Sequence, residues 1–108
     1  MSELSEIVDE LLKFRDERDW EQFHKPKDLA LAVSVEASEL LELYLWKEHA
    51  DPEKVKEEIA DVFLFLLLLA EKYGFDVKEI VMEKMEKNRK KYPVEKAKGS
   101  AKKYTEYK

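Results

Sequence analysis

The chain has 108 residues, enough for one domain with a single hydrophobic core. It contains no cysteine, which excludes disulfides and thiolate metal sites. A formal net charge of −5 argues against binding to nucleic acid polymers, and a composition rich in Glu, Lys and Leu with two glycines favours an all-α fold.

The N-terminal segment predicts an amphipathic helix from about Ser2 to Arg18, with Ser2 or Ser5 as its N-cap. Its apolar residues fall on one stripe, namely Leu4, Ile7, Val8, Leu11 and Leu12. The acidic opening of the chain is unlike a signal peptide, so we expect a cytoplasmic protein.

Residues 19–26 show no helical periodicity and contain two aromatic residues and a histidine. Loops that carry large aromatic side chains commonly contact a partner or ligand. Trp20, Phe23 and His24, together with Trp46, could form a pocket in which a nucleobase stacks. Core packing or a subunit interface explains the same side chains equally well.

Three further helices are expected, spanning about residues 26–49, 52–74 and 76–92. Asp51 as N-cap and Pro52 at the first helical position mark the start of the middle one. Gly74 suits a left-handed C-cap at its end. Asp76 followed by Glu79 resembles a capping box for the last helix, which ends before the next proline.

The helix predicted from residue 52 is apolar on nearly every side from Val62 to Ala70. This run is far shorter than the roughly 20 residues of a membrane span, so no membrane insertion is expected. One small subunit could hardly cover such a helix. We therefore predict an antiparallel bundle of about four helices, completed by homo-oligomerisation through the second and third.

Two pairs of acidic residues lie on the second and third predicted helices, as Glu36-x-x-Glu39 and Glu58-x-x-Asp61. Residues three apart share one helix face, so each pair can direct two carboxylates at one spot. Both pairs adjoin apolar runs, where charges are costly unless something compensates them. A divalent cation would compensate four carboxylates, whereas a solvated helix face would need none, and the spacing leaves both interpretations open.

The ligand types narrow the choice of metal. All-oxygen ligation suits Mg²⁺, Mn²⁺ or Ca²⁺. A di-iron bundle would need Glu-x-x-His pairs on its helices, which neither His24 nor His49 provides. Because Mg²⁺ commonly binds a few carboxylates together with substrate phosphates, the cluster suggests a phosphorylated substrate.

Charge is spread unevenly along the chain. Residues 1–83 carry 10 basic and 22 acidic side chains, whereas residues 84–108 carry 10 basic and 3 acidic ones. Residues 94–108 predict a basic tail, extended or mobile, that follows a domain of residues 1–93.

The last predicted helix could supply cations to a phosphorylated substrate. Lys84 and Asn88 share one face of it, and Arg89 and Lys91 follow. These groups could hold phosphate oxygens. The same cations could instead only favour the negative C-terminal end of the helix, and spacing alone favours this second interpretation.

Taken together, these residues resemble the MazG-like, all-α nucleoside triphosphate pyrophosphohydrolases, whose signature is Glu-x-x-Glu, a spacer, and then Glu-x-x-Asp. The resemblance is greatest to the single-domain dCTP pyrophosphatase branch. It is carried by residues 17–24, 43–47, 84–89, 92–93 and 103–106. It implies Mg²⁺-dependent hydrolysis of a nucleoside triphosphate to the monophosphate and pyrophosphate, by a dimer or a dimer of dimers.

The resemblance also implies roles for individual residues. The metal carboxylates would be Glu36, Glu39, Glu58 and Asp61. The substrate-binding residues would be Trp20, His24, Trp46, Phe65, Lys84, Asn88, Arg89 and Tyr92. We choose Glu39 as the general base, because one carboxylate must contact water instead of saturating the metal.

Two positions depart from the dCTP-specific pattern. Leu11 stands where some relatives carry a polar, ring-bearing side chain, and Phe65 stands where they carry Tyr. Because Phe65 has no hydroxyl, it cannot donate the hydrogen bond that Tyr could donate. We therefore expect the substrate preference among deoxynucleotides to be broader. Two alternatives stay open: a non-catalytic helical oligomerisation module, and an enzyme of the same superfamily that acts on dUTP or phosphoribosyl-ATP.

Overall fold

In the computed structural model, residues 2–107 are described, and within this range all regular structure is helical, which confirms the all-α fold. The elements are α1 (Glu3–Glu17), η1 (Glu21–Phe23), α2 (Pro26–Glu42), α3 (Pro52–Lys72), α4 (Val77–Lys91), α5 (Val94–Ala97) and η2 (Tyr104–Glu106), where η marks a 3₁₀ helix. None of these helices is long and apolar enough to span a bilayer. The chain divides into two compact units, Met1–Phe75 and Asp76–Lys108.

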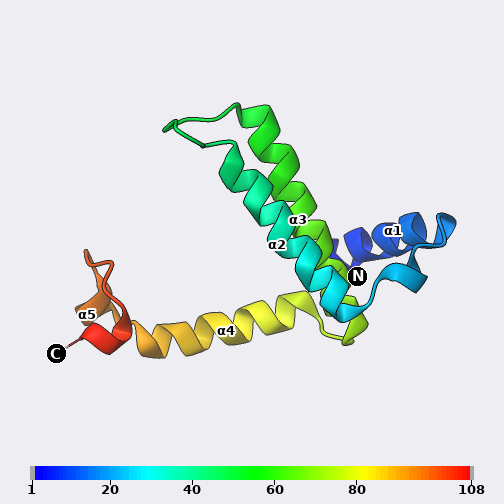
Figure 1. The fold of residues 1–108 in the computed structure, drawn as a ribbon. Helices are drawn as coiled ribbons and strands as arrows, with labels where there is room; N and C mark the ends of the chain where they lie inside the picture. The colour runs from blue at the N-terminus through cyan, green and yellow to red at the C-terminus, as the bar shows by residue number, and fades with distance from the viewer. Residues whose placement is uncertain (1, 108) are drawn as a thin grey trace. The chain divides into compact units, whose positions relative to one another are not determined.

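The first unit is built on α2 and α3, which lie side by side in opposite directions (Figure 1). The helix α1 contacts α3. Within the described residues, the buried apolar side chains are Leu29 on α2 and Leu67, Leu68 and Ala70 on α3. Because the two helices are antiparallel, the first half of α2 lies beside the last half of α3. The buried residues place the core of this unit between these two halves.

Both ends of α3 follow the capping signals of the sequence. At the start, Asp51 Oδ1 accepts a hydrogen bond from the backbone N–H of Glu53 at 3.1 Å, and Pro52 is the first helical residue. At the end, Gly74 has a φ of +70° and its N–H donates to the carbonyl of Glu71 at 3.0 Å. The N–H of Phe75 donates to the carbonyl five residues earlier, which completes a Schellman motif.

The prediction that the second helix ends near His49 is wrong, because α2 ends at Glu42. The next residues form tighter hydrogen bonds between positions three apart, such as Leu45 N–H to the carbonyl of Glu42 at 3.0 Å. Trp46 then has a φ of +61°, and this left-handed conformation cannot continue a right-handed helix. The chain thereby turns back before the N-cap of α3.

The helix α4 begins as predicted, with Asp76 Oδ1 accepting a hydrogen bond from the backbone N–H of Glu79 at 3.0 Å. The segment after α4, which the sequence predicts as a basic tail, contains two short helical elements, α5 and η2. Tyr92 packs edge-to-face against Tyr104 and Tyr107, with ring centroids 5.9 and 6.0 Å apart. These aromatic contacts give the basic segment a packed structure of its own.

Candidate metal centre

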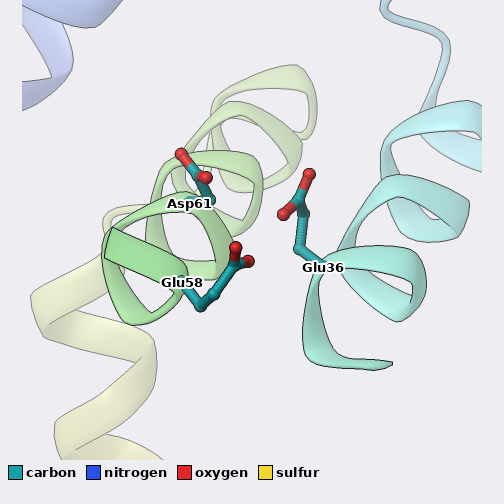
Figure 2. A group of neighbouring side chains, drawn as sticks. All are labelled: Glu36, Glu58 and Asp61. Atoms are coloured by element: carbon teal, nitrogen blue, oxygen red, sulfur yellow. The ribbon is translucent and has the colours of Figure 1, made fainter. Parts of the chain in front are cut away.

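Three of the four predicted metal carboxylates converge between α2 and α3. Glu36 lies on α2, and Glu58 and Asp61 lie on α3, one turn apart. One oxygen from each of these carboxylates lies within 4.8 Å of the other two. Figure 2 shows Glu36 extending from its helix toward the two acidic side chains of the opposite helix. The antiparallel packing of α2 on α3 therefore produces the shared site that the spacing of each pair suggests.

Glu39, the fourth carboxylate, lies one turn further along α2 and is exposed. It is not one of the three residues whose oxygens meet within 4.8 Å. Its charge nevertheless contributes to raising the pKa values of Glu36 and Glu58. Glu39 therefore stands beside the cluster, with its carboxylate open to solvent.

The cluster disfavours the ionised forms of its two half-buried carboxyls, Glu36 and Glu58. Burial raises the pKa of Glu36 to about 7, with further contributions from Glu39, Glu58 and Asp61. Burial is also the largest cause of the raised pKa of Glu58, and the charges of Glu39 and Asp61 add to it. The nearby carboxyl of Glu36 acts in the opposite direction on the pKa of Glu58.

Two oxygens of the cluster have no hydrogen-bond donor. Glu36 Oε2 and Glu58 Oε2 are buried, and no described residue donates a hydrogen bond to either. Buried carboxylate oxygens without a partner are unfavourable, so a proton or a cation must compensate them. Because the donor set is entirely oxygen, these residues fit a hard divalent cation.

The raised pKa values predict how the stability of the metal-free protein depends on pH. The folded protein binds more protons than the unfolded chain wherever the pH lies between the ordinary Glu value of 4.5 and the Glu36 value of about 7. The free energy of unfolding should therefore fall as pH rises through this range.

Urea denaturation in a chelating buffer, from about pH 4.5 to about pH 7.5, measures this slope. A variant with both Glu36→Gln and Glu58→Gln should lose much of it, because these are the two acidic groups with raised pKa values. Stability that rises with pH in the wild-type protein, with no difference in the double variant, would contradict the prediction.

The sequence-predicted residues Trp20 and His24 flank η1. Trp20 is 43% exposed and packs edge-to-face on Phe14, with ring centroids 5.8 Å apart. His24 is half-buried, and its Nδ1 forms no hydrogen bond with any residue of the described range. Burial lowers the pKa of His24, and the charges of Arg15 and Lys72 lower it further, so the imidazole is neutral at physiological pH.

Sequence reasoning missed Arg15, which is only 6% exposed. Its guanidinium pairs with Asp16 and Glu21, each at 2.9 Å, and with Glu71 at 3.4 Å. It therefore ties α1 and η1 to the C-terminal end of α3. One signal was available, because Arg15 follows Leu11 by four residues and so continues the apolar stripe of α1.

The other aromatic candidates of the first unit occupy different surroundings. Trp46 is 95% exposed in the loop after α2. Phe65 is half-buried on α3, four residues after Asp61 and thus on the same side of the helix. The position of Phe65 relative to the carboxylates follows from helix geometry, whereas that of Trp46 depends on the loop.

The remaining candidates lie in the second unit. Lys84, Asn88 and Arg89 are exposed along α4, and Tyr92 is the half-buried C-cap. Arg89 Nη1 pairs with Glu86 at 2.6 Å. The predicted contacts of these four residues with a substrate stay predictions.

Comparison with known proteins gives consistent matches. The model of the MazG-like family matches residues 31–107. Two curated relatives, both named dCTP pyrophosphatase 1, are 42% identical in Rattus norvegicus and 40% identical in Homo sapiens. Each match covers 87% of this chain, and the chain spans 61% of the length of each relative. Among solved structures, a pyrophosphatase from Archaeoglobus fulgidus matches with a TM-score of 0.78 and 41% identity, over 86% of this chain and 94% of that one.

Proposed function

Because the chain belongs to the MazG-like family, we propose that it is a Mg²⁺-dependent nucleoside triphosphate pyrophosphohydrolase. It converts (deoxy)nucleoside triphosphates such as dCTP to the monophosphate and pyrophosphate. The observation that carries this proposal is the convergence of Glu36, Glu58 and Asp61 oxygens within 4.8 Å. The names of the relatives, dCTP pyrophosphatase 1 and a pyrophosphatase, support the reaction class.

In this proposal Glu36, Glu58 and Asp61 hold the cation, with Glu39 beside them. Mg²⁺ suits an all-oxygen donor set that leaves positions for substrate phosphates, and Mn²⁺ suits the same donors. When bound, the cation neutralises and orients the polyphosphate. The raised pKa values of Glu36 and Glu58 mean that cation binding displaces protons, so its affinity increases with pH.

Glu39 serves as the general base. Its carboxylate is exposed beside the cluster and lies outside the set of three converging oxygens. It can therefore accept a proton from a water molecule while the other three carboxylates face the cation. This division of roles assigns metal binding to the three carboxylates whose oxygens converge and proton transfer to the neighbouring Glu39.

The nucleotide is held by residues outside the cluster. Trp20 and Trp46 present exposed indoles on which a base can stack, and His24 offers a neutral imidazole. Lys84, Asn88, Arg89 and Tyr92 supply hydrogen-bond donors for the phosphates. The exposure of Lys84, Asn88 and Arg89 on α4 supports this part of the proposal.

A homo-oligomer is also part of the proposal. Large apolar side chains on α2 and α3 are about half exposed in the single chain, namely Leu31, Val35, Ile59, Phe63 and Leu66. A second copy that covers these two helices would remove this apolar surface from water.

A nucleotide panel with Mg²⁺, scored for released pyrophosphate, tests the function. It contains dCTP, the other deoxynucleoside triphosphates including dUTP, and phosphoribosyl-ATP. Release from dCTP or several deoxynucleotides supports the proposal, and release from phosphoribosyl-ATP alone would reassign the substrate. No release by the folded, metal-loaded protein would instead favour a non-catalytic oligomerisation module.

The substitution Phe65→Tyr should narrow the preference among deoxynucleotides. Phe65 is half-buried on α3 and lacks a hydroxyl, so the wild-type site cannot use a hydrogen bond at this position to select one base. The measurement is kcat/KM for each member of the panel in both proteins. A strict preference of the wild-type protein for dCTP, or an unchanged profile in the variant, would contradict this prediction.

A further inference from the structure

The C-terminal unit contains a cavity that the proposed function does not use. Its volume is about 370 Å³, and its lining residues are Lys96, Ser100, Lys102, Glu106 and Tyr107. They come from α5, from the turn after it, and from the segment around η2. All of them belong to Asp76–Lys108.

Two lysines line this cavity, and neither has a carboxylate partner within the described residues. Among the ion pairs formed by residues 2–107, none involves Lys96 or Lys102. Glu106 is the acidic residue of the lining, and it also forms none of these pairs. Two lysines and one glutamate leave the lining with a net positive charge, so an anion is the complementary ligand.

The hydroxyl of Ser100 adds an uncharged donor to the lining of the same cavity, and Tyr107 also lines it. Ser100 Oγ accepts a hydrogen bond from the N–H of Lys102 at 3.3 Å, which leaves its O–H free to donate. The Tyr107 hydroxyl is buried and has no hydrogen-bond partner among the described residues. Burial raises the pKa of Tyr107, and Tyr92 adds to this effect, so the phenol stays protonated.

The scaffold under the cavity is ordered by aromatic packing. The rings of Tyr104 and Tyr107 both pack on Tyr92 at the end of α4. Gly99, with a φ of +75°, lets the chain turn between α5 and Ser100. Lys96 and Lys102 therefore lie on a folded segment, so less ordering of the backbone is needed when a ligand binds.

We propose that this cavity is a binding site for a phosphate group. Ammonium and hydroxyl donors are the partners that phosphate oxygens prefer, and lysine binds phosphate as a compact point charge. A neutral ligand would leave both lysines uncompensated, and a cation would be repelled. The ligand is pyrophosphate or the phosphate end of a nucleotide. The preference for a phosphate group follows from the lining of the cavity, and only the choice between these two sources rests on the proposed function.

The test is a titration of the wild-type protein in a chelating buffer, followed by the backbone amide signals of residues 96–107. The probes are inorganic phosphate, pyrophosphate and dCTP, and the chelator prevents binding through the carboxylate cluster. Lys96→Gln and Lys102→Gln should each weaken binding by about tenfold. Lys87→Gln is the matched control, because Lys87 is exposed on α4 and does not line the cavity.

Wild-type affinity in both lining variants would overturn the proposal, and so would a tenfold loss in the Lys87 control. Signals from residues outside 96–107 check that each variant is folded. Binding of an inorganic anion identifies a free anion as the source, whereas binding of dCTP alone identifies the nucleotide. The pyrophosphate-release panel tests the proposed function separately, so hydrolysis without binding at this cavity would overturn only the cavity proposal.

Discussion

Replacing Glu39 with Gln should reduce kcat by roughly 10²–10⁴-fold while nucleotide binding is largely retained. Glutamine preserves the size of the side chain but cannot accept the proton of the attacking water. The three converging carboxylates Glu36, Glu58 and Asp61 are unchanged in this variant, so metal binding should persist. Steady-state kinetics of pyrophosphate release, with nucleotide affinity measured by calorimetry in Mg²⁺, separates the two effects.

Glu42→Gln is the matched control, because Glu42 is exposed at the end of α2 and carries no role in the site. It should retain wild-type kinetics. If the Glu39→Gln variant had the wild-type kcat, Glu39 would not be the general base, but the proposed metal site would be unaffected. A parallel loss of metal affinity would show that Glu39 is instead a necessary ligand.

Replacing Glu36 with Gln should have opposite effects on activity and on the stability of the metal-free protein. Glu36 is the carboxyl whose pKa is raised to about 7, and its Oε2 has no donor. A neutral amide removes the unfavourable buried charge and can donate to the unpaired oxygen of Glu58. The melting temperature above about pH 7 should therefore rise in a chelating buffer.

The same substitution removes one of the three converging ligands, so the activity with Mg²⁺ should fall by about 100-fold or more. Adding Mg²⁺ should raise the melting temperature of the wild-type protein and leave that of the variant nearly unchanged. Glu57→Gln, an exposed neighbour on α3 outside the cluster, is the control for loss of one charge. A variant that is less stable than the wild-type protein without metal, yet fully active, would contradict this account.

The features that the sequence predicted well are those governed by neighbouring residues. Asp51 and Pro52 at the start of α3, and Gly74 after its end, act through hydrogen bonds and φ angles within a few residues. The end of α2 was placed too late because residues 43–45 favour helix locally. The left-handed conformation of Trp46, which stops the helix, has no equivalent signal in the local sequence.

The same distinction between features set by local spacing and features set by tertiary packing applies to the candidate site. The spacing of Glu36, Glu58 and Asp61 was sufficient to predict a shared site once two helices were expected to pack in opposite directions. The spacing did not distinguish Glu39 from the other three carboxylates, because a helical pattern does not specify which oxygens converge. Arg15 was missed because its partners come from three separate elements, and such pairing is set by tertiary packing.

The turn after α2 also has an energetic consequence. A non-glycine residue in the left-handed region costs roughly 1–2 kcal/mol, and this cost is already met when the first unit folds. The neighbouring N–H of Lys47 donates to the carbonyl of Tyr44 at 2.9 Å, which fixes the backbone around the ring of Trp46. With 95% of its surface in water, the indole has apolar area still to bury. A flat partner that covers the indole removes apolar surface from water, which favours binding. Because the turn is already formed in the folded protein, little further ordering of the backbone is needed, and this preorganisation favours affinity.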